Sequence, residues 1–242
     1  GCKMINQKSV LAIIPARGGS KGLPKKNIKI MNGKPLIQWT IETALQTTEI
    51  DSILVTTDCP EIQSVALAAG AECPFLRPDV LASDTATSFD AVKHSLDYYA
   101  QELGREFDII VLLEPTSPLR ENTDISNMLS KLEQHYQTHD GIVSLGEVSE
   151  HPSIVKVIDH DGSVVPLDEQ ADSAIRRQDC AKVYFPFGVA YVVKRDVLLK
   201  EKSFYPQRTL PYEIKRYQCY EIDDIYDFLA IENIMKFEWN LK

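Results

Sequence analysis

The stretch SVLAIIPARGGSKG, residues 9–22, decides the fold class of this 242-residue chain. Residues 9–14 form a continuous apolar run, which is typical of a parallel strand buried on both faces. A glycine-rich basic loop follows, and its glycines allow backbone N–H groups to curl around an anion. The loop matches neither the P-loop nor the dinucleotide fingerprint. It therefore indicates either an anion-binding loop of another kind or a plain structural turn.

An alternation of strands and helices continues along the first two thirds of the chain. Further strands are expected at residues 53–57, 71–75, 108–113 and 141–148, and helices at 35–45, 60–69, 88–103 and 123–136. Such alternation predicts an α/β fold with a mostly parallel sheet and helices on both faces. In folds of this kind, ligands bind beyond the carboxyl ends of the strands.

The pattern changes from about residue 151. Residues 153–158, followed by Asp161-Gly162, predict a hairpin, which we interpret as part of an arm or a dimer contact. Strands are expected at 183–193 and 212–217, and a closing helix at 225–237. Because no linker or boundary is evident, we expect a single domain over residues 1–242 with a dimerisation arm at about 149–182.

Charge and cysteine content narrow the choice of partners and compartment. The net charge is −9, which disfavours nucleic acid and anionic membranes as partners, yet residues 1–41 carry eight basic residues and no acid. This local excess indicates a small anionic ligand, although a solvated basic stretch has the same composition. Five cysteines without a C-x-x-C pair argue against a disulfide framework, so a cytoplasmic location is expected. The apolar runs are too short to span a bilayer.

Six motifs in order give the sequence a specific resemblance. Residues 14–27, IPARGGSKGLPKKN, are followed by TTD at 56–58, LRP at 76–78, LASDTA at 81–86, PTSPLR at 115–120 and RRQ at 176–178. Together they resemble the CMP-sialic acid synthetases, or acylneuraminate cytidylyltransferases, over almost the whole chain. The resemblance implies a Rossmann-like homodimer with a dimerisation arm, which transfers CMP from CTP to an acidic nine-carbon sugar and releases pyrophosphate.

The resemblance also implies roles on the nucleotide side. The residues concerned are Arg17, Ser20 and Lys21 at the CTP phosphates, Lys26 and its supporting Asn27 at the α-phosphate, and Arg77, Ala86 and Ser88 at the cytosine and ribose. Arg17 and Lys26, with Asp223, would form the catalytic set. Without the resemblance, Arg77 could equally be a surface salt-bridge residue. None of the five scattered histidines stands out as a general base.

The acidic segment before the last helix is the candidate metal site. If that segment is extended, Glu221 and Asp223 point to the same side, and two carboxylates with phosphate oxygens suit Mg²⁺. The alternative is helix capping, which we favour for Asp224. For Asp223 the resemblance decides in favour of the metal, because the family has aspartates in an I-D-I-D-type segment. Glu221 replaces the first of those aspartates.

Departures from the family pattern fall on the expected sugar side. Glu114 stands where the family usually has Gln, and YFPFG at 184–188 replaces the usual Y-R-P-N-G. The expected sugar-binding residues are Glu114, Arg177, Tyr184, Phe185 and Phe187. These changes indicate a modified sugar, and the sequence resembles the branch that activates legionaminic acid. The alternatives are N-acetylneuraminate, the eight-carbon sugar Kdo, and a nucleotide-sugar binding protein that has lost catalysis.

Overall fold

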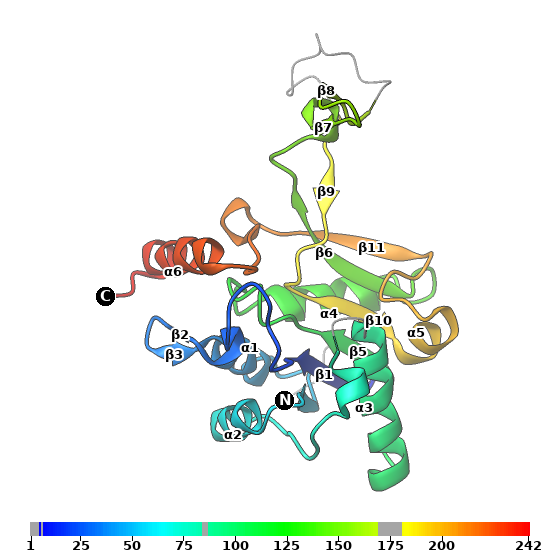
Figure 1. The fold of residues 1–242 in the computed structure, drawn as a ribbon. Helices are drawn as coiled ribbons and strands as arrows, with labels where there is room; N and C mark the ends of the chain where they lie inside the picture. The colour runs from blue at the N-terminus through cyan, green and yellow to red at the C-terminus, as the bar shows by residue number, and fades with distance from the viewer. Residues whose placement is uncertain (1–4, 6, 84–86, 169–180) are drawn as a thin grey trace.

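The computed structural model describes residue 5 and residues 7–83, 87–168 and 181–242. Its centre is a mixed sheet in the order β11-β6-β10-β5-β1-β4 (Figure 1). These strands are β1 (Val10–Pro15), β4 (Ser52–Thr56), β5 (Ile109–Leu112), β6 (Gly141–Glu147), β10 (Tyr191–Lys194) and β11 (Thr209–Glu213). β1 pairs in parallel with β4 and β5, and β11 in parallel with β6, whereas β10 is antiparallel to both of its neighbours. The predicted, mostly parallel α/β sheet is confirmed.

Alternate residues of β1 face two separate helical layers. The helices are α1 (Leu36–Leu45), α2 (Pro60–Ala69), α3 (Ser88–Leu103), α4 (Asp124–Gln134), α5 (Arg195–Glu201) and α6 (Ile225–Trp239). Val10, Ala12 and Ile14 share a buried cluster with residues of α1, α2 and α4. Leu11 and Ile13 pack instead with residues of α3 and α5. Burial on both faces explains why the run at residues 9–14 is apolar throughout.

Local sequence signals account for several helix boundaries. α2 begins with Pro60 and ends at Gly70, whose φ of 101° lies in the left-handed region that favours glycine. α3 starts with a capping box between Thr87 and Asp90. α6 is capped by Asp224, as predicted, because its side chain accepts a hydrogen bond from the Asp227 N–H at 3.0 Å.

Short elements complete the fold and include the differences from prediction. They are η1 (Lys26–Ile28), β2 (Ile30–Met31), β3 (Lys34–Pro35), η2 (Asp79–Leu81), η3 (Pro152–Ile154), β9 (Tyr184–Phe185) and η5 (Arg216–Gln218). The strand expected at 71–75 is only a bridge between Leu54 and Glu72. The strand expected at 183–193 is divided into β9 and β10, because Pro186 lacks the N–H that a continuous ladder requires. The strand expected at 212–217 begins earlier, as β11, and α5 was not anticipated.

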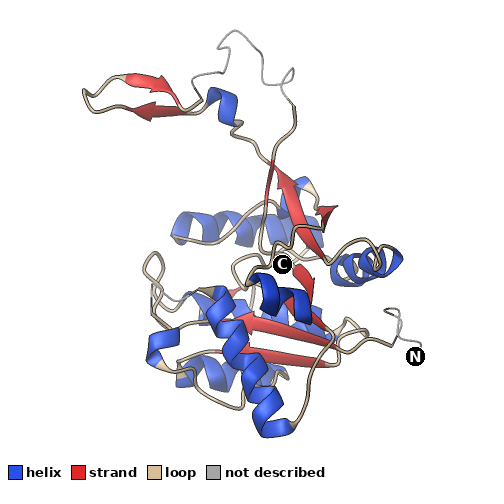
Figure 2. Ribbon diagram, turned by 90° about the vertical axis from the view of Figure 1, so that its right-hand side faces the viewer, coloured by secondary structure: helices blue, strands red, loops and turns tan. Residues whose placement is uncertain are grey.

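The predicted hairpin is present and stands away from the body. It consists of β7 (Lys156–Ile158) and β8 (Val164–Pro166), which pair with each other alone among the described strands. Figure 1 shows the hairpin beyond the far end of β6, away from the rest of the sheet, and Figure 2 shows the same separation from the side.

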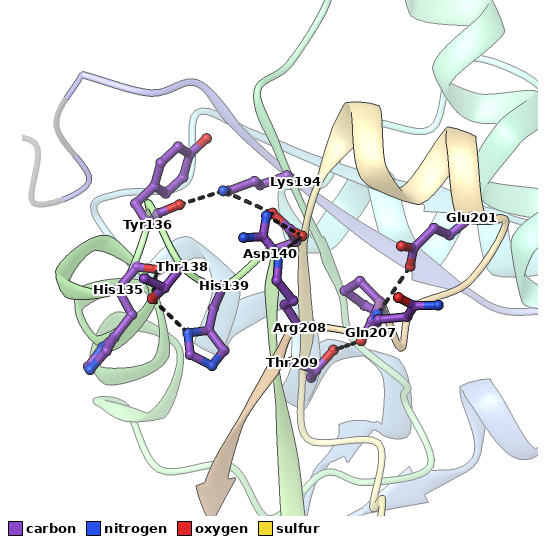
Figure 3. Close-up of polar contacts among 11 residues, drawn as sticks. His135, Tyr136, Thr138, His139, Asp140, Lys194, Glu201, Gln207, Arg208 and Thr209 are labelled. Carbon is purple, nitrogen blue, oxygen red and sulfur yellow. Dashed lines mark hydrogen bonds and ion pairs between the residues drawn. The ribbon is translucent and has the colours of Figure 1, made fainter.

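A charge network around the buried Asp140 links the strands at the amino end of β6. Asp140, just before β6, accepts hydrogen bonds from Lys194 at 3.1 Å and from the Arg208 guanidinium at 3.0 and 2.9 Å (Figure 3). Because Lys194 ends β10 and Arg208 precedes β11, the network ties three strands together. It has a structural role at the edge opposite the carboxyl ends of the parallel strands. None of the described helices has the length and apolar character needed to cross a membrane.

Candidate active site

A cavity of about 490 Å³ lies at the carboxyl ends of β1 and β5. Its walls come from the loop after β1, the start of α3, the residues after β5 and the segment before α6. The lining includes Arg17, Ser20, Lys21, Gly22, Lys26, Asn27, Arg77, Ser83, Thr87, Ser88, Glu114, Thr116 and Asp223. The cavity thus contains both basic side chains and two carboxylates, and it lies at the edge of the sheet where α/β folds bind their ligands.

The basic loop is held from behind by backbone contacts. Gly18 donates its N–H to the Asp58 carboxylate at 2.8 Å, and the Asn27 amide donates to the carbonyl of Arg17 at 3.3 Å. A Cβ on Gly22 would overlap the carbonyl oxygen of Asp223 and lie 3.1 Å from its carbonyl carbon. The loop therefore packs directly against the acidic segment, and only glycine allows that approach.

Lys26 is a half-buried cation between the loop and the acidic segment. Its Nζ donates to the carbonyl of Ile222 at 3.3 Å. Burial lowers the pKa of Lys26, while the charges of Asp223 and Glu114 act in the opposite direction. The preceding residue, Lys25, has a φ of 53°, and this left-handed turn directs the chain into η1. The fold thus holds an ammonium group against the acidic wall of the cavity.

Arg77 is buried, with 7% of its surface exposed. Its guanidinium donates to the carbonyls of Leu81 and Thr56, both at 3.0 Å, while its Nε is buried without a hydrogen-bond partner. The alternative of a surface salt bridge is therefore wrong. Arg77 fastens the 79–81 turn to the end of β4 and contributes to the cavity wall.

Two carboxyl groups with raised pKa values lie on the side of the cavity near β5. Burial, reinforced by the charge of Glu221, raises the pKa of Glu114 to about 7. Burial also raises the pKa of Glu221, whose Oε1 accepts the Gly188 N–H at 2.9 Å. Glu114 and Asp223 line the cavity, whereas Glu221 lies behind its wall.

The aromatic residues of the expected sugar site lie elsewhere in the chain described. Tyr184 and Phe185 are exposed in β9 at the base of the arm. The Phe187 ring lies 4.9 Å from the Phe185 ring, centroid to centroid, and against Gly146 of β6. None of the three lines the cavity.

Two of the expected site residues, Ala86 and Arg177, lie outside the described residues.

Two residues to which the sequence analysis assigned no role hold the residues of the cavity wall in position. Asp58 fixes the basic loop, and Arg120 is fully buried next to Glu114. Asp58 belongs to the TTD motif at 56–58 and Arg120 to the PTSPLR motif at 115–120, so the motifs themselves could have indicated both residues.

Comparisons with known proteins agree with this geometry. A family model described as cytidylyltransferase matches residues 11–240. The CMP-N,N'-diacetyllegionaminic acid synthase of Legionella pneumophila is 35% identical over 228 residues, which cover 94% of this chain and 96% of that protein. An N-acylneuraminate cytidylyltransferase of Streptococcus agalactiae serotype V is 34% identical over 236 residues, covering 96% of this chain and 54% of that protein. The chain thus spans about half the length of that relative.

A solved structure shares the fold. CMP:2-keto-3-deoxy-manno-octonic acid synthetase, solved with CTP, superimposes with a TM-score of 0.68 at 20% identity, covering 95% of this chain and 99% of the other. At that identity the likeness concerns the fold alone. The family match covers nearly every described element, including the whole wall of the cavity. From this match we conclude that the chain belongs to the cytidylyltransferase family.

Proposed function

We propose that this protein transfers CMP from CTP to the anomeric hydroxyl of a nonulosonic acid and releases pyrophosphate. The observation that carries the proposal is that a basic loop faces the carboxyl groups of Glu114 and Asp223 across one cavity. The basic loop provides the positive charge that a triphosphate needs. The two carboxyl groups suit a polyhydroxylated sugar and a divalent cation. The names of the relatives, which include a CMP-N,N'-diacetyllegionaminic acid synthase, support the same reaction class.

On the nucleotide side, the chain would act by positioning and by charge neutralisation. Arg17, Ser20 and Lys21 would bind the phosphates, and their position in the cavity wall along the basic loop supports this role. Lys26 would neutralise the charge that develops at the α-phosphate when the sugar hydroxyl attacks in line. Its partly desolvated ammonium makes each such contact stronger than it would be in water.

The acidic segment fits Mg²⁺ in the way that nucleotide enzymes use it. No group of three or more potential metal-binding side chains occurs in the part of the chain that the structure describes. Mg²⁺ usually takes one or two carboxylates with phosphate oxygens and water, and Asp223 offers such a carboxylate in the cavity. The ion would stabilise the departing pyrophosphate. Glu221 would support it from behind the wall, where its carboxylate is held by Gly188.

Among nonulosonic acids we favour legionaminic acid. Above about pH 7, where Glu114 is ionised, its carboxylate only accepts hydrogen bonds, so it suits the N–H of a 7-acetamido group better than a hydroxyl-rich tail. The Legionella pneumophila relative matches over nearly its full length, which supports this choice. Phe185 and Phe187 could favour an apolar C9 only if they approach the sugar, and in the single chain they lie at the base of the arm.

The decisive experiment is pyrophosphate release from CTP with legionaminic acid, N-acetylneuraminate or Kdo in the presence of Mg²⁺. We expect CMP-sugar with the first two, higher kcat/KM for legionaminic acid, and little reaction when UTP, ATP or GTP replaces CTP. CTP binding without turnover of any sugar would favour the alternative of a nucleotide-binding protein. Equal turnover with UTP would contradict the assignment of the cavity.

The hairpin suggests a second copy of this chain as partner. Ile158 and Val164 are 76% and 70% exposed on the arm, and an isolated two-stranded hairpin is only marginally stable in water. A homodimer that covers these side chains would bury the exposed apolar surface and would also stabilise the hairpin. Ile158→Asp should therefore shift the protein toward the monomer in light scattering, whereas Lys156→Asp, which adds the same residue on β7, should act less. An unchanged dimer in Ile158→Asp, or a monomeric parent, would contradict the role of the arm.

A further inference from the structure

Arg120 is a buried guanidinium that joins the two backbone segments beside the acidic wall. Its Nη2 donates to the carbonyl of Glu114 at 2.7 Å and to that of Gly188 at 2.9 Å. The remaining donors reach Val189 and Thr40, each at 2.6 Å. One planar group thus fixes the residue after β5 relative to the residues before β10. A lysine cannot reproduce this arrangement, because it lacks the rigid fork of donors.

Gly188 lies between the two carboxyl groups and touches both residues. Its N–H donates to the Glu221 carboxylate at 2.9 Å, and its carbonyl accepts the N–H of Glu114 at 3.2 Å. A Cβ on Gly188 would lie 2.7 Å from the Cβ of Glu114 and 2.9 Å from its Cδ. The φ of Gly188 is not positive, so alanine could adopt this backbone, and the obstacle to it is the Glu114 side chain.

We infer that Arg120 and Gly188 are positioning residues, which together set where the carboxyl groups of Glu114 and Glu221 stand relative to Lys26. The inference rests on the proposed function, because that function assigns Glu114 to the side of the cavity that receives the sugar and Glu221 to the support of the metal ion. Arg120 holds the backbone at Glu114 and Gly188. Gly188 then holds the Glu221 carboxylate by its N–H and leaves the space that the Glu114 side chain fills.

Gly188→Ala tests the inference, since the added methyl must displace the Glu114 side chain. With legionaminic acid, kcat should fall by roughly 10², which is typical when a reacting group moves by about 1 Å. The dissociation constant for CTP, measured by calorimetry, should stay near the parental value. Gly141→Ala is the matched control, because its Cβ would lie 2.9 Å from the carbonyl of Val192 at the far end of β6. It should lower thermal stability and leave kcat unchanged.

A double-mutant cycle separates positioning from general damage to the fold. In a Glu114→Gly background, the extra Gly188→Ala change should cost little further activity, because the displaced side chain is gone. Additive losses in the two variants would overturn the inference.

Arg120→Lys should likewise lower kcat and retain CTP affinity. Thr40→Val, which removes only one acceptor of Arg120, should keep parental kinetics. Loss of CTP binding in folded Arg120→Lys would contradict the assigned role. If Arg120→Lys does not fold, the double-mutant cycle of Glu114→Gly and Gly188→Ala tests the inference by itself.

A structural measurement keeps the inference distinct from the proposed function. If the parent binds CTP but turns over no sugar, the proposed reaction fails. A crystal structure of Gly188→Ala then still reports the position of Glu114. A displaced Glu114 carboxyl group upholds the positioning role, and an unmoved one overturns it.

Discussion

Gly22→Ala is the substitution that most directly tests the contact between the basic loop and the acidic segment. Gly22 lies in the loop wall of the cavity, and its φ is not positive, so the backbone itself accepts alanine. The new methyl would overlap the carbonyl oxygen of Asp223 and lie 3.1 Å from the carbonyl carbon. Carbon–oxygen contacts settle at about 3.3–3.6 Å. The two segments must therefore separate by more than about 1 Å.

Such a separation moves Lys26 and Asp223 apart, since Lys26 binds the carbonyl next to Asp223. A displacement of about 1 Å between reacting groups can cost 10² in rate. We therefore expect kcat for pyrophosphate release to fall by about that factor in Gly22→Ala. CTP affinity should weaken less, because the basic residues of the loop remain in place.

Gly19→Ala is the matched control within the same loop. A Cβ at Gly19 has no neighbouring atom within 4 Å, and Gly19 does not line the cavity. Both variants should be assayed with CTP and sugar at saturation, with melting temperatures measured in parallel. If Gly22→Ala keeps parental kcat, the loop and the acidic segment are not coupled as the structure indicates. If Gly19→Ala loses as much activity as Gly22→Ala, the effect belongs to loop flexibility instead.

Three further substitutions test the charges of the cavity. Lys26→Ala should lower kcat by about 10²–10³ with a smaller effect on CTP binding; near-parental kcat would make Lys26 a solvated charge. Asp223→Asn should remove most activity and raise the Mg²⁺ concentration needed for the remainder; full activity at low Mg²⁺ would exclude a metal role. The pKa of Glu114 is raised from 4.5 to about 7, so its stabilising proton is lost as pH rises through 7. Between pH 4.5 and 7, unfolding free energy should therefore decline in the parent relative to Glu114→Gln, by up to about 3 kcal/mol; parallel curves by denaturant titration would contradict the raised pKa.

Much of the α/β body could be predicted, because its signals are local. The apolar run at 9–14, the proline and glycine that bound α2, and the hairpin turn at 161–162 each depend on neighbouring residues only. No strand forms at 71–75, because Pro74 lacks the N–H that a continuing ladder beside β4 would require. A single bridge to Leu54 remains there.

The positions of the residues proposed to bind the nucleotide were more predictable than those of the residues proposed to bind the sugar, for the same reason. Arg17, Ser20, Lys21 and Lys26 come from one continuous loop, so a motif in the sequence already places them together. The expected Phe185 and Phe187, by contrast, lie where β9 leaves the body toward the arm. In the proposed homodimer, their relation to the sugar would depend on what covers the arm, which no local pattern in the sequence reveals.

The acidic wall illustrates how distant residues create chemistry that no single motif contains. Glu114 follows β5, Gly188 precedes β10 and Glu221 precedes α6, yet one N–H and one guanidinium join them. Burial next to Glu221 gives Glu114 a pKa of about 7, whereas a glutamine at this position would carry no charge at any pH. A single-residue departure from the family pattern thus changes the charge and hydrogen-bonding capacity of the wall near neutral pH. Because Lys26 faces the same wall, in the proposed reaction the choice of residue 114 would bear on the charge balance at the α-phosphate as well as on the sugar.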